Sequence, residues 1–303
     1  MATLKIGTRS SPLALWQASQ VKNLLEAQGE PCQLVPLHSD GDFNQTTPIY
    51  SMGVQGVFTR SLDAALLAGT IDLAVHSMKD VPMQLASGLV QAAVLERGPA
   101  EDVLVLNAGL AQPQPGATWH IATCSVRRRA QWLQKYPQSQ VHDIRGNVDT
   151  RLQKLQQSPW HGAIFAKAGL QRIGLLPPHH TTLHWMLPAP AQGAIVVTAR
   201  RQDKALLHTC QGINHEETAL CTHIERSFMH SLGLGCAAPV SAQAQMHGTH
   251  ISFVGNLCLP NGSALIEVSC TFALHEAEEA GAIAAQKLLA EGGGRLLQNL
   301  HHG

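Results

Sequence analysis

The fold of this chain is first indicated by the stretch Ile71-Asp72-Leu73-Ala74-Val75-His76-Ser77-Met78-Lys79-Asp80-Val81-Pro82. Its first half is an apolar run typical of a buried strand, and its second half holds polar residues and ends at a proline. Asp80 is therefore expected in a loop just past the carboxyl end of a strand, where ligand sites form in open parallel sheets. An aspartate beside a lysine at such a place is a candidate acid, base or charge stabiliser. A surface Lys–Asp pair in an ordinary turn is the plain alternative.

The sequence before this stretch alternates between strand and helix patterns. Strands are expected at residues 4–8 and 33–38, and helices at 13–28 and 57–68, with Ser11 as the N-cap of the first helix. A β-α-β-α-β order predicts a parallel sheet with right-handed crossovers.

A second βα unit follows the first and is joined to it twice. Residues 96–101 form a crossing between two strand patterns, the βα rhythm restarts at residue 119, and residues 188–193 lead back to a strand at 194–199. Two crossings predict a hinge and a cleft, the layout of a two-domain binding protein. The remainder predicts helices and then an antiparallel sheet closed by a helix at 276–291, which makes a small α+β domain.

The expected fold class is thus α/β with three domains: two βα domains joined by a hinge, and a small α+β C-terminal domain. The expected bounds are 1–98 with 192–213 for domain 1, 99–191 for domain 2 and 214–303 for domain 3.

Composition excludes several classes of function. Lysine plus arginine equals aspartate plus glutamate, at 21 each, whereas a general nucleic-acid binder has a basic excess. No apolar run approaches the roughly 20 residues that span a bilayer, and no signal pattern opens the chain, so a cytoplasmic protein without a membrane partner is expected. The seven cysteines are scattered without a C-x-x-C pair, and the seventeen histidines lack a ligand spacing, so no metal is expected.

Positive charge is concentrated in one region. Between residues 120 and 175 nine lysines and arginines stand against two aspartates, an excess of +7 in a chain of zero net charge. Several of these arginines follow strand patterns, so they are expected at one crevice, where backbone N–H groups add affinity for anions. Arginine suits bidentate binding of carboxylate or phosphate. The alternative is that helix arginines such as Arg129 and Arg151 only solvate a surface. No phosphate-binding glycine motif is present, which argues against a nucleotide.

Cys236 differs from the other cysteines because it lies among small residues, between Gly233 and Pro239. Backbone without bulky side chains lets a large group approach or attach to the sulfur. Taken alone, a plain turn cysteine remains the simpler interpretation.

Seven motifs follow one another along the chain. They are Ser10-Ser11-Pro12-Leu13-Ala14-Leu15-Trp16-Gln17, Ala74-Val75-His76-Ser77-Met78-Lys79-Asp80-Val81-Pro82, Ser125-Val126-Arg127-Arg128, Ile144-Arg145-Gly146-Asn147-Val148-Asp149-Thr150-Arg151-Leu152, Ala168-Gly169-Leu170 with Arg172, Ala191-Gln192-Gly193-Ala194 and Gly235-Cys236. In order and spacing, over essentially the whole length of the chain, these motifs resemble the porphobilinogen deaminase (hydroxymethylbilane synthase) family.

This resemblance implies a monomeric, cytoplasmic transferase of tetrapyrrole (heme) biosynthesis. It implies that four porphobilinogen molecules are joined head to tail, with loss of ammonia, to give linear hydroxymethylbilane. It further implies that the growing chain is held on a covalent dipyrromethane cofactor, and that the two βα domains are of the periplasmic-binding-protein type. A polyanion of this kind fits the arginine-rich crevice expected from the residues.

The resemblance also implies roles for particular residues. Cys236 would carry the cofactor through a thioether, and Asp80 would be the central catalytic carboxylate, a buried group that stabilises developing positive charge. Cofactor contacts are implied for Lys79, Thr123, Ser125, Arg127, Arg128, Arg145 and Gly146. Substrate contacts are implied for Arg9, Ser11, Arg151, Arg172 and Gln192.

The chain also departs from the family pattern. Ser51 and Gln55 stand where lysines are common, Asp40 and Glu101 stand where arginine is expected, and Cys124 and Leu234 replace a serine and a glycine. Each cation lost removes a contact to the elongating chain, so slower late elongation is expected. Two alternatives stay open: a catalytically weakened paralogue, and a two-domain carboxylate-binding protein on the same fold.

Overall fold

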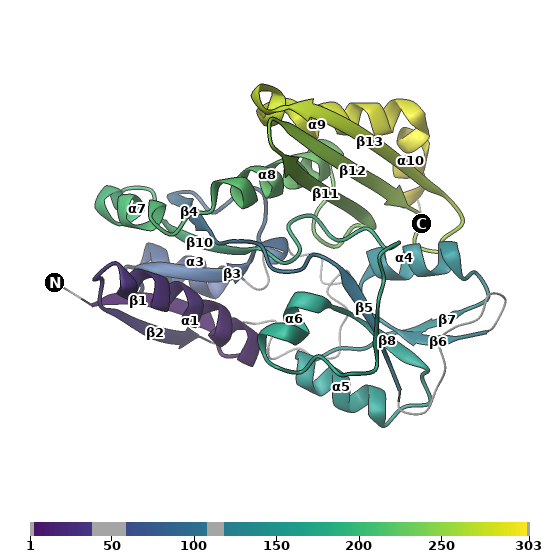
Figure 1. The fold of residues 1–303 in the computed structure, drawn as a ribbon, viewed down its shortest axis with the longest axis horizontal. Coiled ribbons are helices and arrows are strands. Elements are labelled where there is room, and N and C mark those ends of the chain that lie inside the picture. The colour runs from purple at the N-terminus through teal and green to yellow at the C-terminus, as the bar shows by residue number, and fades with distance from the viewer. Residues whose placement is uncertain (1–2, 38–58, 108–117, 302–303) are drawn as a thin grey trace. The chain divides into compact units, whose positions relative to one another are not determined.

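A computed structural model describes residues 3–37, 59–107 and 118–301 of the chain (Figure 1). The chain divides into two compact units. Unit 1 holds the N-terminal part up to Gly98 together with Gly193–Leu220, and unit 2 holds Pro99–Gln192 and Cys221–Gly303. Across the described ranges, no helix is both long enough and apolar enough to cross a membrane.

Unit 1 is built on a five-stranded sheet in the order β2-β1-β3-β10-β4. Its strands are β1 (Leu4–Arg9), β2 (Cys32–Leu37), β3 (Leu73–Ser77), β4 (Leu89–Val94) and β10 (Ile195–Arg200). Its helices are α1 (Pro12–Ala27), α3 (Arg60–Leu67) and α7 (Lys204–Gln211). The expected strands and helices are confirmed, and Ser11 caps α1 by accepting a hydrogen bond from the backbone N–H of Ala14.

The sheet of unit 1 is mixed rather than wholly parallel. β1 is parallel to β2 and β3, but β10 pairs antiparallel with both β3 and β4. The expectation of a parallel sheet was therefore wrong for the strand that returns after the second crossing. The chain enters that strand from the other unit, so no crossover helix forces it to run parallel.

Two apolar layers cover the faces of this sheet. One joins Ile6 and Leu73 of the sheet to Val21 and Leu25 of α1, and the other joins Leu62 of α3 to the opposite face. Leu24 of α1 is 43% exposed, because it lies on the flank of the apolar stripe that contains Val21 and Leu25.

Unit 2 contains a second five-stranded sheet in the order β7-β6-β8-β5-β9. Its strands are β5 (Asp102–Leu106), β6 (His120–Ala122), β7 (Gln140–His142), β8 (Gly162–Ala166) and β9 (His180–Thr182). Its helices are α4 (Val126–Lys135), α5 (Val148–Gln156) and α6 (Lys167–Arg172). β6, β7 and β8 are parallel, and β5 runs antiparallel to β8. The two sheets therefore have the same arrangement of strands, although the sequence contains no internal repeat.

One strand of this sheet was not expected. His180 follows Pro177 and Pro178, a pattern typical of a loop, but it lies in β9 and pairs with Val105 of β5. Three residues at the edge of a sheet give too short a pattern to be recognised without the partner strand.

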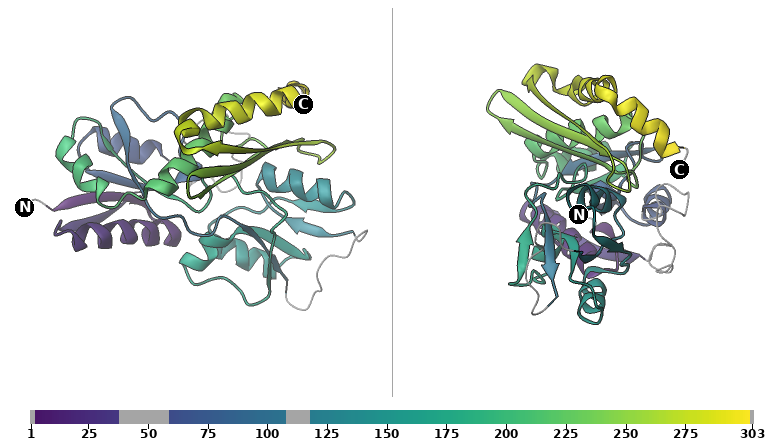
Figure 2. Two further views of the ribbon diagram at one scale, coloured as in Figure 1. Left: turned by 45° about the horizontal axis from the view of Figure 1, so that its top comes forward. Right: turned by 90° about the vertical axis from the view of Figure 1, so that its right-hand side faces the viewer.

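The C-terminal part of unit 2 is an antiparallel sheet of β11 (Val240–His247), β12 (His250–Cys258) and β13 (Leu265–Ala273). Helix α8 (Glu216–Ser231) precedes it, and α9 (Ala277–Leu288) packs along its strands (Figures 1 and 2). The last helix was expected to stop at the glycines after residue 291. Instead Gly292 makes a kink at φ +111° and the chain resumes as α10 (Gly294–His301), because a glycine permits that turn without ending the helical path.

Candidate active site

In unit 1, the sequence motifs gather at the carboxyl edge of the parallel strands. β1 ends at Arg9 and its neighbour β3 ends at Ser77, and the register pairs Gly7 with Ala74. Lys79 and Asp80 follow at once in a single 3-10 turn, Met78–Asp80. The expected position of Asp80 just past a strand is confirmed, but the expectation that it is buried was wrong, because its side chain is exposed.

Helix α1 forms a hydrogen bond with the last residue of β3. The Gln17 amide of α1 donates to the Ser77 hydroxyl at 2.9 Å, which fixes the end of β3 against the helix. His76 lies one residue earlier and is buried, with its Nε2 atom lacking a hydrogen-bond partner among the described residues. Burial and the nearby charge of Arg9 lower the pKa of His76 to about 4, so its ring is neutral at neutral pH.

In unit 2, a second set of motif residues lies at the corresponding edge of its parallel strands. β6, β7 and β8 are neighbours, so the segments that follow them begin side by side. The Thr123 hydroxyl accepts a hydrogen bond from the Ser125 backbone N–H, and Ser125 caps α4 by accepting from the backbone N–H of Arg128. These two residues therefore shape the start of the helix that carries Arg127 and Arg128.

Asp102 organises a buried cluster at the start of α4. One carboxylate oxygen accepts from Arg127 Nη2 at 2.7 Å, and the other accepts from Arg128 Nη2 at 2.8 Å and from the Gln192 amide at 2.9 Å. Asp102 is fully buried, and the two arginine side chains are 4% and 7% exposed. Burial alone would raise the pKa of Asp102, but the charges and hydrogen bonds of the two arginines hold that pKa well below its usual range.

This cluster carries an uncompensated positive charge. Two guanidinium groups face one carboxylate, and Arg127 Nε is buried without a hydrogen-bond acceptor among the described residues. A buried charge is costly unless it is paired. Sequence reasoning missed Asp102, because an aspartate that opens a strand pattern gives no signal of the two arginines that fold over it.

Three more predicted residues surround the same edge. Gly146, at φ +116°, permits the turn after β7, and a Cβ there would lie 2.9 Å from Thr150 Cγ2. The Arg151 guanidinium lies over the Phe165 ring at 5.3 Å, and burial lowers the pKa of Arg172 to about 10. Arg145 Nη1 is buried and has no acceptor in the part of the chain that is described.

Arg129 differs from its neighbours in α4. Its guanidinium donates to the Val141 carbonyl at 2.6 Å, which ties the helix to β7. Arg129 therefore makes a structural contact within unit 2, whereas the alternative expected it only to solvate a surface.

Cys236 lies in the loop between α8 and β11 and is exposed. Gly233 precedes it at φ +70°, and Ala238 N–H closes a turn onto the Gly235 carbonyl. The other six cysteines are buried or half-buried. Burial raises the pKa of the Cys210 and Cys258 thiols, to about 12 and about 11, so these two are poor nucleophiles.

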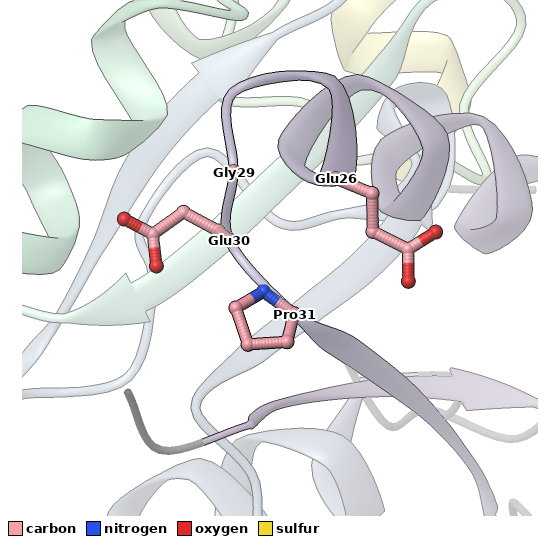
Figure 3. A pocket seen from close by; sticks show the side chains of 4 residues that line it. All are labelled: Glu26, Gly29, Glu30 and Pro31. Carbon is pink, nitrogen blue, oxygen red and sulfur yellow. The ribbon is translucent and has the colours of Figure 1, made fainter.

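A shallow hollow elsewhere in unit 1 does not fit an anionic ligand. It is lined by Glu26, Gly29, Glu30 and Pro31 in the turn between α1 and β2 (Figure 3). Because β2 begins there and runs parallel to β1 and β3, this turn lies at the amino edge of the sheet, opposite Asp80. Two carboxylates in it would repel a carboxylated substrate.

The structure thus brings the predicted residues into two groups. Arg9, Ser11, Lys79 and Asp80 share the carboxyl edge of unit 1, and the arginines with Gln192 gather in unit 2. Ser51, Gln55 and Asp40 lie outside the described residues. Within the described ranges, no group of three or more histidine, cysteine, aspartate or glutamate residues could hold a metal ion.

Comparison with known proteins identifies the family. The family model "Porphobilinogen deaminase, dipyromethane cofactor binding domain" matches residues 4–208, and "Porphobilinogen deaminase, C-terminal domain" matches residues 219–290. The chain belongs to the porphobilinogen deaminase family. The resemblance expected from the motifs is thereby confirmed, together with the transferase class, the porphobilinogen deaminase function and the dipyrromethane cofactor.

Relatives in this family match over nearly the full length. The chain is 38% identical to the porphobilinogen deaminase of Syntrophomonas wolfei over 301 residues, which covers 98% of each chain. It is 39% identical to that of Rubrobacter xylanophilus, with 97% of this chain and 96% of the relative covered. These matches do not favour the alternative of a carboxylate-binding protein.

Solved structures that resemble the chain include bacterial solute-binding proteins. An ancestral cationic amino acid solute binding protein aligns at a TM-score of 0.43 and 11% identity, covering 69% of this chain and 86% of its own. The second substrate binding domain of a putative amino acid ABC transporter from Streptococcus pneumoniae aligns at 0.45 and 11%, covering 70% and 92%. The expected class, mixed α/β with a separate C-terminal α+β part, agrees with the strand orders and the two family models.

Proposed function

We propose that this member of the porphobilinogen deaminase family carries its cofactor on Cys236 and uses Asp80 as the catalytic carboxylate. The arginines of unit 2 bind carboxylate groups. Four porphobilinogen molecules are joined head to tail, with release of ammonia, to give linear hydroxymethylbilane. The observation that carries the role of the arginines is the buried arginine cluster of unit 2, which has more positive charge than its own carboxylate neutralises.

The residues present fit a dipyrromethane group. Each of its pyrrole rings bears carboxylates, and the buried Nε of Arg127 and Nη1 of Arg145 are donors that lack an acceptor among the described residues. Charge-assisted hydrogen bonds from such donors are roughly twice as strong as neutral ones. When bound, the group supplies the pyrrole carbon to which the first substrate is joined.

Each set of side chains has a distinct task in this reaction. Arg127, Arg128 and Arg145 hold cofactor carboxylates, with Lys79, Thr123, Ser125 and Gly146 assisting through charge, hydrogen bonding and the shape of the turns. Arg9, Ser11, Arg151, Arg172 and Gln192 bind substrate carboxylates. Asp80, at the end of β3, stabilises the positive charge that develops as ammonia leaves, and its carboxylate oxygens can hold or pass on a proton.

The attachment site is tested by intact mass under denaturing conditions. Wild-type protein from cells able to make porphobilinogen is expected to carry the added mass of one dipyrromethane, and Cys236→Ser is expected to carry none. Cys270→Ser is the matched control and should keep the added mass, because Cys270 is half-buried in β13. Unmodified wild-type protein would remove Cys236 and its cofactor from the proposal.

The three domain bounds, the cytoplasmic location and the monomeric state are part of the proposal. Seven free cysteines in the structure suit a reducing compartment. Light scattering of purified protein at several concentrations tests the monomer, and a mass that doubles with concentration would contradict it.

Slower late elongation, caused by the altered residues Asp40, Ser51, Gln55 and Glu101, also remains a prediction.

A further inference from the structure

The buried cluster around Asp102 is more than an ion pair, because it also holds both chain crossings. The Gln192 amide donates to Asp102 at 2.9 Å and to the Ala100 carbonyl at 2.6 Å. Ala100 lies in the crossing at residues 96–101 and Gln192 in the crossing at 188–193, each within two residues of a point where the chain passes between units. One carboxylate therefore joins the outgoing crossing, the returning crossing and the start of α4.

A second layer of hydrogen bonds fixes α4 to the returning crossing. Arg127 Nη1 donates to the Leu187 carbonyl at 2.7 Å, and the Gln131 amide donates to that carbonyl and to the Ser241 hydroxyl, each at 2.9 Å. Gln131 in turn accepts from the Leu187 N–H. The backbone before Gln192 is thus held to the arginine helix at several points.

The returning crossing is also held from the side of the C-terminal sheet. Ala191 adopts a left-handed conformation at φ +60°, and its N–H donates to the fully buried Glu225 carboxylate at 2.7 Å. The other oxygen of Glu225 accepts from the Ala244 N–H at 2.8 Å. A non-glycine residue persists in that region only when its surroundings hold it there.

We propose that Asp102 is a positioning residue for the cofactor site. Its carboxylate sets the orientation of the Arg127 and Arg128 guanidinium groups before the cofactor binds and anchors them to both crossings through Gln192. This inference rests on the proposed binding of cofactor carboxylates by these arginines. Asp102 itself touches neither cofactor nor substrate.

The geometry explains why a carboxylate is required at this position. Asp102 accepts from four donor atoms, which are Arg127 Nη2, Arg128 Nε, Arg128 Nη2 and Gln192 Nε2. An asparagine presents one acceptor oxygen and one N–H₂ group, so donors would face donors on one side. At least one guanidinium must then turn away from its present orientation.

The test compares Asp102→Asn with wild-type protein in two measurements. The first is the rate at which apo protein gains cofactor mass as a function of porphobilinogen concentration. The second is the difference in Tm between holo and apo protein. We expect Asp102→Asn to need about tenfold or more porphobilinogen for half-maximal loading, the scale of one lost charge-assisted hydrogen bond, and to lose most of the holo-minus-apo Tm shift.

Two further variants separate positioning from charge and from general stability. Asp102→Glu keeps the charge but moves the carboxylate by one methylene, so it should fold and still load less readily than wild type. Asp72→Asn is the matched control, because Asp72 also pairs with an arginine, Arg200 at 3.3 Å, at the far edge of unit 1 from Asp80. It should lower the Tm of apo and holo protein equally and leave loading unchanged.

Each outcome decides the proposal. A holo-minus-apo shift equal to wild type in Asp102→Asn would overturn it, as would wild-type loading by Asp102→Glu, which would show that charge alone matters. Failure of both variants to fold would assign Asp102 to folding instead. Wild-type protein that gains no cofactor mass would overturn the proposed function itself, which is a separate result.

Discussion

At the scale of single residues, Asp80 and Asp102 are two carboxylates in opposite surroundings. Asp80 is exposed at the end of β3, whereas Asp102 is fully buried between two arginines. A buried, saturated carboxylate has no capacity left for a substrate, while an exposed one can meet it. This contrast supports the proposed chemistry at Asp80 and the proposed positioning role of Asp102.

Asp80→Asn is expected to lower turnover by about 10²–10⁴-fold, the usual contribution of a positioned acid or base. Because the side chain is exposed, Tm should change little. The variant should keep its cofactor mass, which intact-mass measurement checks alongside steady-state kinetics. Turnover within a few-fold of wild type would remove Asp80 from the centre of the reaction.

His76 makes folding stability depend on pH. Its pKa is lowered to about 4 in the folded protein by burial and by Arg9, against about 6.5 in an unfolded chain. The unfolded state therefore binds the proton first. The stabilising contribution is complete above pH 6.5 and is lost as the pH falls towards 4, by up to about 3 kcal/mol.

Urea unfolding of wild type and His76→Gln between pH 7.5 and pH 4 measures this contribution. The variant should lose less stability than wild type over that interval, whatever its stability at pH 7.5. His230→Gln, at an exposed position in α8, is the control and should follow the wild-type slope. Parallel slopes for wild type and His76→Gln would contradict the assignment.

At the scale of elements, the segments that follow β6, β7 and β8 decide what unit 2 can bind. Ser125 is the N-cap of α4. Gly146, with its positive φ, forms the turn between Arg145 and the start of α5. The Lys154 ammonium donates to the Arg145 carbonyl at 2.9 Å and holds that turn from the helix side. The arginines are thus placed by caps and turns, which bring them together although they are far apart in sequence.

Arg145→Ala and Arg129→Ala form a matched pair at this scale. Arg145 has a buried nitrogen without an acceptor among the described residues, so its loss should impair cofactor loading far more than Tm. Arg129 ties α4 to β7 through the Val141 carbonyl, so its loss should lower Tm and leave loading near wild type. Mass spectrometry of loading and thermal unfolding of both variants check this, and equal losses in both measurements for Arg145→Ala would favour a structural role.

At the scale of the whole molecule, charge is balanced in total but separated along the chain. Nine basic residues against two acidic ones lie between residues 120 and 175, while the net charge is zero. Such separation attracts an anionic substrate without making the protein a general polyanion binder. Added salt should weaken this attraction, because the Debye length falls from about 10 Å at 0.1 M to about 3 Å at 1 M.

KM for porphobilinogen is therefore expected to rise several-fold between 0.05 M and 0.5 M sodium chloride, where screening becomes strong on the scale of a binding site. The kcat should change less, because the chemistry takes place at short range. Tm should hardly respond, since buried apolar layers hold the sheets. A KM that is constant over this range would show that the arginines do not act through long-range charge.

The sequence by itself determined the order of elements, the carboxyl-edge position of Asp80, the N-cap at Ser11 and the family. These features depend on local patterns, in which the period of apolar residues, a capping serine or a motif can be recognised without knowing what lies opposite. The direction of β10, the existence of β9 and the exposure of Asp80 depended on partners that are distant in the chain. Only the tertiary structure placed Asp102 beside Arg127 and Arg128. A buried ion cluster depends on which strands become neighbours, and the sequence of one strand does not determine its partner.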